Sequence, residues 1–216
     1  MIVRLVGSEM CIRDSPLIFP EPNRPGEHEV VSQGNFHGEI VALTCDAMSL
    51  AMFELGSISE RRMDQMLDPA RSEMPAFLAK DSGLESGLMI VQYVAGASLA
   101  ELHGQTTPRS AFSTTTSAGQ EDHVSMGATA AWNLHVGVRR LSEVLACEAL
   151  IAAEALEHAT LRSSPHVRAM HDLVRTVASA LVGDRSTSAE LMQIADELRQ
   201  PGWLARLEAE HGRLPR

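Results

Sequence analysis

The chain is poor in cysteine and in positive charge. Its three cysteines, Cys11, Cys45 and Cys147, lie far apart and form no Cys-x-x-Cys pair. Neither a disulfide framework nor a thiolate zinc site is expected, and a reducing, cytoplasmic compartment fits this pattern. The 18 Lys and Arg residues are scattered among 28 Asp and Glu residues, for a net charge of -10. Because no basic run is present to neutralise phosphates, nucleic acid is excluded as a partner.

The sequence also lacks a long apolar run. The longest, Gly87 to Ala100, contains Gln92 and is shorter than the roughly 20 residues that span a bilayer. No transmembrane helix and no membrane partner are therefore expected. No GxGxxG, GxSxG or phosphate-loop motif occurs. His166 and His171 do not share a helical face, so no metal site is expected.

The first fifteen residues differ from the rest. Met1 to Ser15 contain neither an apolar segment long enough for a signal peptide nor a small-residue cleavage site. Met10 to Ser15 read MCIRDS, which resembles a translated sequencing adapter. We therefore expect residues 1–15 to be a non-native leader left by sequence assembly and residues 16–216 to form the protein proper.

Two short β-prone runs follow. Pro16 to Phe19 and Glu29 to Ser32 are separated by a segment with three prolines and Gly26, which permits a positive φ. This arrangement predicts a small N-terminal β-hairpin.

The segment from Glu39 to about Glu54 predicts a buried helix, because its apolar residues fill two adjoining helical faces. Gly56 leaves two alternatives. It interrupts this helix, with Ser57 and Glu60 as a capping box for a new one, or it lies inside a single longer helix.

Further helices are expected along the chain. Gly87 to Leu102 is apolar enough for a second buried helix, and Ser125 to Ala159 has apolar residues at three- and four-residue steps, as in a long amphipathic helix. Gln105 to Thr116 is rich in Ser and Thr and predicts an irregular loop. A second loop is expected between Asp68 and Pro75, because each residue before a proline is pushed out of the helical region.

Two more helices are predicted near the C-terminus. Ser164 as N-cap and Pro165 as first helical residue begin one of them, and an apolar stripe extends it to Leu181, with Gly183 just after its end. Thr187 and Glu190 begin the other as a capping box. Long helices with few strands predict the all-α class, a bundle with a small β-hairpin. A helix that is apolar nearly all round needs neighbours on most sides, which favours a bundle inside an oligomer.

Three sequence blocks carry a family resemblance: QGNFHGE at Gln33 to Glu39, GSISERR at Gly56 to Arg62 and TSAGQEDHVSMG at Thr116 to Gly127. In order and spacing they resemble the C-terminal part of histidine ammonia-lyases, within the aromatic amino-acid lyase family. The resemblance runs from about Pro16 to about Ala159. It implies a C-terminal bundle of long, near-parallel helices, a homotetramer, and release of ammonia from L-histidine to give urocanate.

The resemblance also implies a methylidene-imidazolone cofactor, which forms autocatalytically from an internal Ala-Ser-Gly triplet. No such triplet occurs here: Ala97-Ser98 is followed by Leu99, and Ser117-Ala118-Gly119 has the wrong order. The family's N-terminal catalytic tyrosine has no counterpart either, because Tyr93 lies inside an apolar run. We therefore expect a fragment of a lyase that is inactive alone.

The resemblance assigns catalytic roles to Phe36 and Glu121. Phe36 aligns with a phenylalanine that packs beside the imidazolone and substrate, and an ordinary core aromatic is the alternative. The small and polar neighbours Gly34, Asn35 and Gly38 would make a poor core. Glu121 aligns with a residue that faces the substrate's amino group or imidazole and is replaced by Gln in phenylalanine-specific relatives. Its alternative is a favourable charge or cap at a helix N-terminus.

Four further residues, Asn35, His37, Gln120 and His123, are expected to bind substrate or to lie directly behind the residues that do. His37 and His123 are expected to be hydrogen-bonded structural histidines rather than an acid or a base.

Some positions depart from the family's usual pattern: Ala100 to His103 replace Ser-Glu-Asn-Lys, Thr107-Pro108 replaces His-Pro, and Phe112 replaces an Asp. Glu101 thereby loses a lysine partner, which only a protonated His103 could replace. A tyrosine or phenylalanine ammonia-lyase or aminomutase therefore stays open, as does a non-catalytic helical oligomerisation protein.

Overall fold

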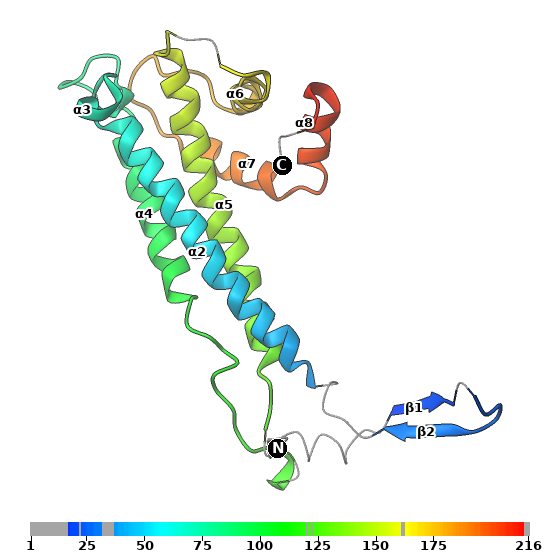
Figure 1. Ribbon diagram of the computed structural model, residues 1–216. Coiled ribbons are helices and arrows are strands. Elements are labelled where there is room, and N and C mark those ends of the chain that lie inside the picture. The colour runs from blue at the N-terminus through cyan, green and yellow to red at the C-terminus, as the bar shows by residue number, and fades with distance from the viewer. Residues whose placement is uncertain are drawn as a thin grey trace. The chain divides into compact units, whose positions relative to one another are not determined.

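A computed structural model describes residues 17–21, 23–31, 37–119, 121, 123–160 and 163–213. The expected leader and the N-terminal part of the QGNFHGE block lie outside these ranges. Helices dominate, and the only sheet among the described residues has two strands, so the predicted all-α class is confirmed (Figure 1). The main elements are β1 (Leu17–Pro20), β2 (His28–Val31), α2 (Glu39–Leu67), α3 (Pro69–Ser72), α4 (Met89–Gly104), α5 (Gly127–Glu157), α6 (Pro165–Val177), α7 (Ser188–Arg199) and α8 (Trp203–His211).

The chain divides into two compact units. The first comprises residues 1–50 and 105–136, and the second comprises residues 51–104 and 137–216. Two of the three boundaries fall inside helices, one in α2 and one in α5, and the third lies at the end of α4.

The predicted hairpin is confirmed in the first unit. Strands β1 and β2 pair antiparallel, with Ile18 opposite Val30 and Phe19 opposite Glu29. The turn between them is closed by the amide of Glu21, which donates to the carbonyl of Glu27 at 3.0 Å. Gly26 has φ +89°, a conformation that glycine adopts without steric cost.

The rest of the first unit is built from the first turns of α2 and α5 and the loop before α5. Its small apolar core consists of Ala42, Cys45 and Ala130, against which Leu134 packs. Gly127 allows a close approach here, because a Cβ at this position would lie 3.3 Å from Ser125 Oγ and 3.7 Å from the carbonyl oxygen of Gly38.

The second unit contains the larger core, where the remaining part of α2 lies beside α4 and α5, and α6 and α7 add apolar side chains to the same core (Figure 1). Gly56 lies inside a continuous α2, so the single longer helix is the correct alternative. A Cβ there would lie 3.2 Å from Leu99 Cδ1 and 3.3 Å from Leu102 Cδ2, so glycine lets α4 approach closely. The largest fully buried side chains of this unit are Met63, Leu78, Leu88, Leu102, Val144, Leu150 and Ile151.

The beginning of α6 is as predicted, but its end is not. The Ser164 hydroxyl accepts a hydrogen bond from the amide of Val167 at 3.4 Å, which confirms the cap. The helix ends at Val177, before Leu181, the last residue of the predicted apolar stripe. The amide of Leu181 donates to the carboxylate of Glu154, so this part of the backbone finds its partner outside the helix.

Two other local predictions need correction. Helix α7 begins directly after Thr187, as predicted, but the Thr187 side chain makes no capping hydrogen bond, and Glu190 forms an ion pair with Arg185 at 3.1 Å. The loop expected between Asp68 and Pro75 contains the short helix α3. The Asp68 side chain caps α3 by accepting from the amide of Ala70 at 2.9 Å. The sequence analysis also missed α8.

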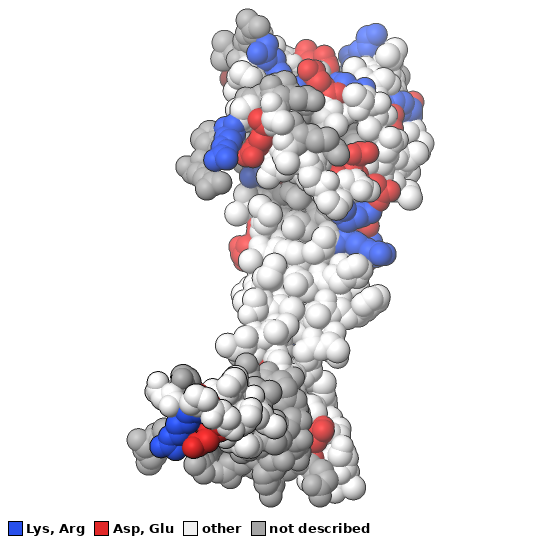
Figure 2. Space-filling model, turned by 90° about the vertical axis from the view of Figure 1, so that its right-hand side faces the viewer, with Lys and Arg blue, Asp and Glu red and all other residues white. Residues whose placement is uncertain are grey.

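Helix α2 carries much exposed apolar surface. Among the described helices it alone is long and apolar enough to cross a membrane by length and composition. The same criterion accepts a helix that other protein segments cover. A broad part of the face drawn in Figure 2 bears few charged side chains. The exposed apolar side chains of α2 in the first unit are Ile40, Val41, Leu43, Met48 and Leu50.

Candidate active site

The structure describes three of the six predicted site residues. His37, Glu121 and His123 all belong to the first unit. Phe36, Asn35 and Gln120 lie outside the described residues, so their roles stay predictions.

Two of the three sequence blocks meet in this unit. The hydroxyl of Ser125 donates to the carbonyl of His37 at 2.6 Å. His123 Nε2 lies 3.3 Å from Glu39 Oε2. His123 and Ser125 of the third block are therefore held against residues 37 and 39, which follow Phe36 closely in the sequence.

Glu121 is half-buried in the loop before α5. Its backbone forms a bridge with Thr116, whose amide donates to the Glu121 carbonyl at 2.8 Å. The Thr116 hydroxyl donates to the Glu121 carboxylate at 2.9 Å. Helix α5 begins only at Gly127 and Glu121 pairs with Thr116, so the alternative role as an N-terminal cap is wrong.

The turn between Thr116 and Glu121 has an unfavourable backbone. Ser117 and Ala118 both have φ +54°, and Gly119 follows with φ +87°. Left-handed conformations cost non-glycine residues free energy, and they persist where surrounding contacts impose them. The Thr116–Glu121 bridge is such a contact, because it closes this turn.

A buried carboxylate anchors the same loop at its start. Asp46 Oδ1 accepts from the amide of Arg109 at 3.0 Å, and Asp46 Oδ2 accepts from the amide and hydroxyl of Ser110 at 2.9 and 2.7 Å. Burial raises the pKa of Asp46, but the hydrogen bonds from Ser110 and Arg109 lower it more, so its pKa lies below the usual value. Asn133, also buried, donates to the carbonyl of Gln105 at 2.7 Å and accepts from the Arg109 guanidinium at 3.0 Å.

The third sequence block, GSISERR, has a packing role in the second unit. Gly56 makes room for α4. The hydroxyl of Ser59 and the guanidinium of Arg62 both donate to Glu148 on α5, the latter through two nitrogens. This block therefore joins α2 to α5.

Neither near match to the cofactor triplet has the surroundings of a ring precursor. Ala97, Ser98 and Leu99 lie inside α4, and the hydroxyl of Ser98 donates to Glu143 at 2.7 Å. Ser117, Ala118 and Gly119 form the left-handed turn next to Glu121. The described residues therefore do not fit the methylidene-imidazolone group as its source.

Sequence reasoning missed several polar residues that the structure brings together. Glu39 and Ser125 stand inside the recognised blocks, so their motif membership was a signal. Asp46 and Asn133 had none, because each looks like an ordinary polar residue of a helix. Glu101 also has a cationic partner that was missed, since Arg140 on α5 forms its ion pair. His103 packs against Phe53, with ring centroids 5.0 Å apart and ring planes tilted by 54°.

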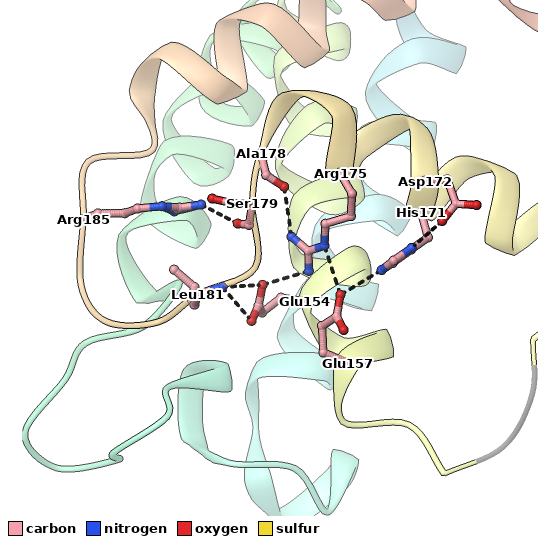
Figure 3. A network of polar contacts seen from close by, with 9 residues as sticks. All are labelled: Glu154, Glu157, His171, Asp172, Arg175, Ala178, Ser179, Leu181 and Arg185. Atoms are coloured by element: carbon pink, nitrogen blue, oxygen red, sulfur yellow. Dashed lines mark hydrogen bonds and ion pairs between the residues drawn. The ribbon is translucent and has the colours of Figure 1, made fainter.

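A second polar cluster lies in the second unit, where Figure 3 shows Arg175 between Glu154 and Glu157. Arg175 donates to Glu154 at 2.9 Å and to Glu157 at 3.1 Å, and His171 Nε2 lies 2.9 Å from Glu157. The hydrogen bond to Glu157 is the main reason that the pKa of His171 is raised. Among the described residues no group of His, Cys, Asp and Glu side chains could hold a metal ion.

Cys147 is not a candidate nucleophile. Burial in the second core raises the pKa of its thiol to about 12. The thiol therefore stays protonated at neutral pH and behaves as a small apolar side chain.

The helical fold and the meeting of the two blocks agree with one protein family. The family model for aromatic amino acid lyases matches residues 8–176. The chain belongs to the aromatic amino acid lyase family. The match begins inside the expected leader and runs past Ala159, where the resemblance was expected to fade.

Within this family, the chain is similar in sequence to histidine ammonia-lyases. The chain is 47% identical over 187 residues to a histidine ammonia-lyase of Deinococcus radiodurans, covering 87% of the chain and 35% of that relative. It is 40% identical over 215 residues to a histidine ammonia-lyase of Symbiobacterium thermophilum, covering 99% and 41%. The chain thus spans well under half the length of the curated relatives it matches.

Solved structures give the same picture of the fold. Histidine ammonia-lyase from Trypanosoma cruzi superposes with a TM-score of 0.80 at 36% identity, over 91% of this chain and 38% of that one. Tyrosine aminomutase from Streptomyces globisporus superposes with a TM-score of 0.81 at 30% identity, over 89% and 37%. Lyases and aminomutases therefore share this fold.

Proposed function

We propose that this chain is the C-terminal part of an enzyme that eliminates ammonia from L-histidine to give urocanate, and that Glu121 and Phe36 belong to its substrate pocket. The observation that carries the proposal is the pair of contacts that join Ser125 to the carbonyl of His37 and His123 to Glu39, directly after Phe36 in the sequence. The histidine ammonia-lyases among the relatives support L-histidine as the substrate.

The surroundings of Glu121 suit a residue that binds a cation. Its carboxylate accepts a hydrogen bond from the neutral Thr116 hydroxyl. No Arg, Lys or His of the described residues forms an ion pair with it. A half-buried carboxylate without a cationic partner attracts a positively charged ligand. In this proposal the ligand is the ammonium or imidazole group of histidine.

His37, His123, Asn35 and Gln120 support this pocket in the proposal. The contact of His123 with Glu39 and that of the His37 carbonyl with Ser125 tie the two blocks together. These residues shape the backbone on which Phe36 and Glu121 stand.

The electrophile is not supplied by the residues of this chain. In the family, a methylidene-imidazolone makes the amine a better leaving group or acidifies the β-hydrogen. The chain has no Ala-Ser-Gly triplet. In the proposal, the group and the catalytic tyrosine come from residues outside this sequence. The 216-residue chain should therefore produce no urocanate from L-histidine, as followed by urocanate absorbance, and turnover above background would contradict the proposal.

Replacement of Glu121 tests the substrate assignment. In a full-length protein that carries this chain, Glu121→Gln should lower kcat/KM for histidine by roughly 10²-fold, about 2.7 kcal/mol at the transition state. Glu29→Gln, an exposed carboxylate of the hairpin, is the matched control and should leave kcat/KM unchanged. Unaltered histidine turnover in Glu121→Gln would remove Glu121 from the site.

A second candidate is a tyrosine or phenylalanine ammonia-lyase or aminomutase. It is favoured by the tyrosine aminomutase structure with the same fold and by Phe112, which is exposed on the loop of Glu121. With an apolar ring as substrate, Glu121→Gln should be neutral or helpful, because desolvating an unpaired carboxylate is costly. Turnover of all three amino acids by both proteins separates the candidates.

The proposal includes a soluble cytoplasmic homotetramer. The exposed apolar side chains of α2 support it, because large exposed apolar surfaces mark sites of protein interaction. A non-catalytic helical oligomerisation protein is the remaining alternative. A complete upstream reading frame without Ala-Ser-Gly would favour that alternative over the enzyme.

A further inference from the structure

The loop from Gln105 to Met126 is held at two places along its length. At its start, Asp46 on α2 accepts the amides of Arg109 and Ser110, each through its own carboxylate oxygen, at 3.0 and 2.9 Å. At its end, Ser125 donates to the carbonyl of His37. Asp46 is only 8% exposed, so its two acceptors have little water as an alternative partner.

Two cross-links connect the anchored start of the loop to Glu121. The amide of Val124 donates to the hydroxyl of Ser113 at 3.0 Å. Closer to the tip, Thr116 bonds Glu121 through both backbone and side chain. Through these hydrogen bonds, the position of the loop backbone at Arg109 and Ser110 affects the position of the part of the loop that carries Glu121.

We infer that Asp46 is a positioning residue for Glu121: by clamping the amides of Arg109 and Ser110 it sets where the Glu121 carboxylate meets the substrate's cationic group. The inference rests on the proposed function. Asp46 itself does not touch the substrate, and it acts through the loop. Asn133 completes the anchor, because it holds the carbonyl of Gln105 and the guanidinium of Arg109.

Asp46→Asn is the sharpest change. Asparagine keeps the size of the side chain but offers a single acceptor oxygen. Its amide nitrogen would face one of the two backbone N–H donors, which then loses its partner in a buried place. The matched control is Asp184→Asn in the second unit, because Asp184 accepts the amides of Ser86 and Gly87, both at 2.9 Å, in a loop without Glu121.

The test is a double-mutant cycle in the full-length protein that carries this chain. With Glu121 present, Asp46→Asn should lower kcat/KM about 10-fold, mainly by raising KM, because the displaced Glu121 binds the substrate more weakly. In the Glu121→Gln background the same change should cost less than about 2-fold, since residues that act through one another are not additive. Asp184→Asn should cost less than about 2-fold in both backgrounds. An equal loss from Asp46→Asn in both backgrounds, or no loss with Glu121 present, overturns the inference.

Hydrogen exchange separates failure of this inference from failure of the proposed function. If the unaltered protein turns over none of histidine, phenylalanine or tyrosine, the proposed function fails. Hydrogen exchange of the loop amides still tests the positioning role of Asp46 in that case. Asp46→Asn should speed exchange of the amides of Thr116, Glu121 and Val124 about 5-fold or more, while α5 core amides and the Asp184→Asn protein stay unchanged. Unchanged exchange at Thr116 and Glu121 overturns the inference whatever the activity.

Discussion

Asp46 in the first unit and Glu154 in the second hold irregular segments to long helices in different electrostatic surroundings. Asp46 is satisfied by neutral donors, the amides of Arg109 and Ser110 and a hydroxyl. Glu154, whose side chain is only 5% exposed, accepts the amide of Leu181 and the guanidinium of Arg175. The contacts of Asp46, called here the first clamp, depend on backbone geometry. The contacts of Glu154, called the second clamp, depend on a neighbouring cation.

The difference matters because a buried charge is tolerated only with its partners. Removing one member of a buried ion pair leaves an uncompensated charge, whereas a carboxylate bound by backbone amides keeps them through most side-chain changes. Replacing a neighbouring arginine should therefore cost less stability at the first clamp, around Asp46, than at the second clamp, around Glu154.

The largest expected effect is on the second clamp. Arg175→Met removes the guanidinium from buried Glu154 and also from Glu157 and from the carbonyl of Ala178. The free energy of unfolding of the 216-residue chain should fall by about 3 kcal/mol, as measured by urea titration. Arg168→Met on the exposed side of the same helix is the control and should change it by less than about 0.5 kcal/mol. A loss as small as the control's would mean that Glu154 does not need its cation.

The corresponding change at the first clamp should cost less. Arg109→Met removes the hydrogen bond to Asn133 but leaves both amides on Asp46. The free energy of unfolding should fall by about 1 kcal/mol in the same titration. Arg139→Met, exposed on α5, serves as the control. A loss as large as that of Arg175→Met would abolish the contrast between the clamps.

The two regions should also differ in their response to pH. The pKa of His171 is raised, mainly by its hydrogen bond to Glu157. Its contribution to stability is thus fully present below the unfolded pKa and is lost as pH rises through the folded one. Glu157 has a lowered pKa, mainly because of His171, so its contribution is lost only as pH falls through that lowered value.

His171→Gln should therefore cost about 0.5 kcal/mol at pH 5.5 and less at pH 8.5, because the pair is partly exposed and screened. Asp46 has a lowered pKa and is ionised at both pH values. The cost of Asp46→Asn should be the same at pH 5.5 and pH 8.5. Urea titrations of both variants at the two pH values test this, and a pH-dependent cost at Asp46 would contradict the assignment.

The smallest effect is expected outside both clamps. Deleting residues 1–15, the expected non-native leader, should change the free energy of unfolding by no more than about 0.5 kcal/mol. A larger loss on deletion, measured in the same titration, would identify these residues as authentic structure.

Local signals in the sequence were sufficient for most helices and for the hairpin. The Ser164 cap with Pro165 predicted the start of α6, and the β-prone runs around Gly26 predicted the paired strands. These features depend on residues that are close together in the sequence, so they can be predicted without knowing the rest of the fold. The assignment of Glu121 to the site came from the family resemblance of its sequence block. Its role in binding the substrate stays a prediction.

What the sequence alone determined about this protein is its helical class, its hairpin and its membership of the aromatic amino acid lyase family, because period, caps and motif blocks are local in the chain. Only the tertiary structure decided where α6 ends, that α2 continues through Gly56, and that Asp46 clamps the loop of Glu121. Asp46 and Arg109 are 63 residues apart, and no local pattern records such a pair. Their contact exists because buried amides and carboxylates must find partners, and the fold determines which ones are in reach.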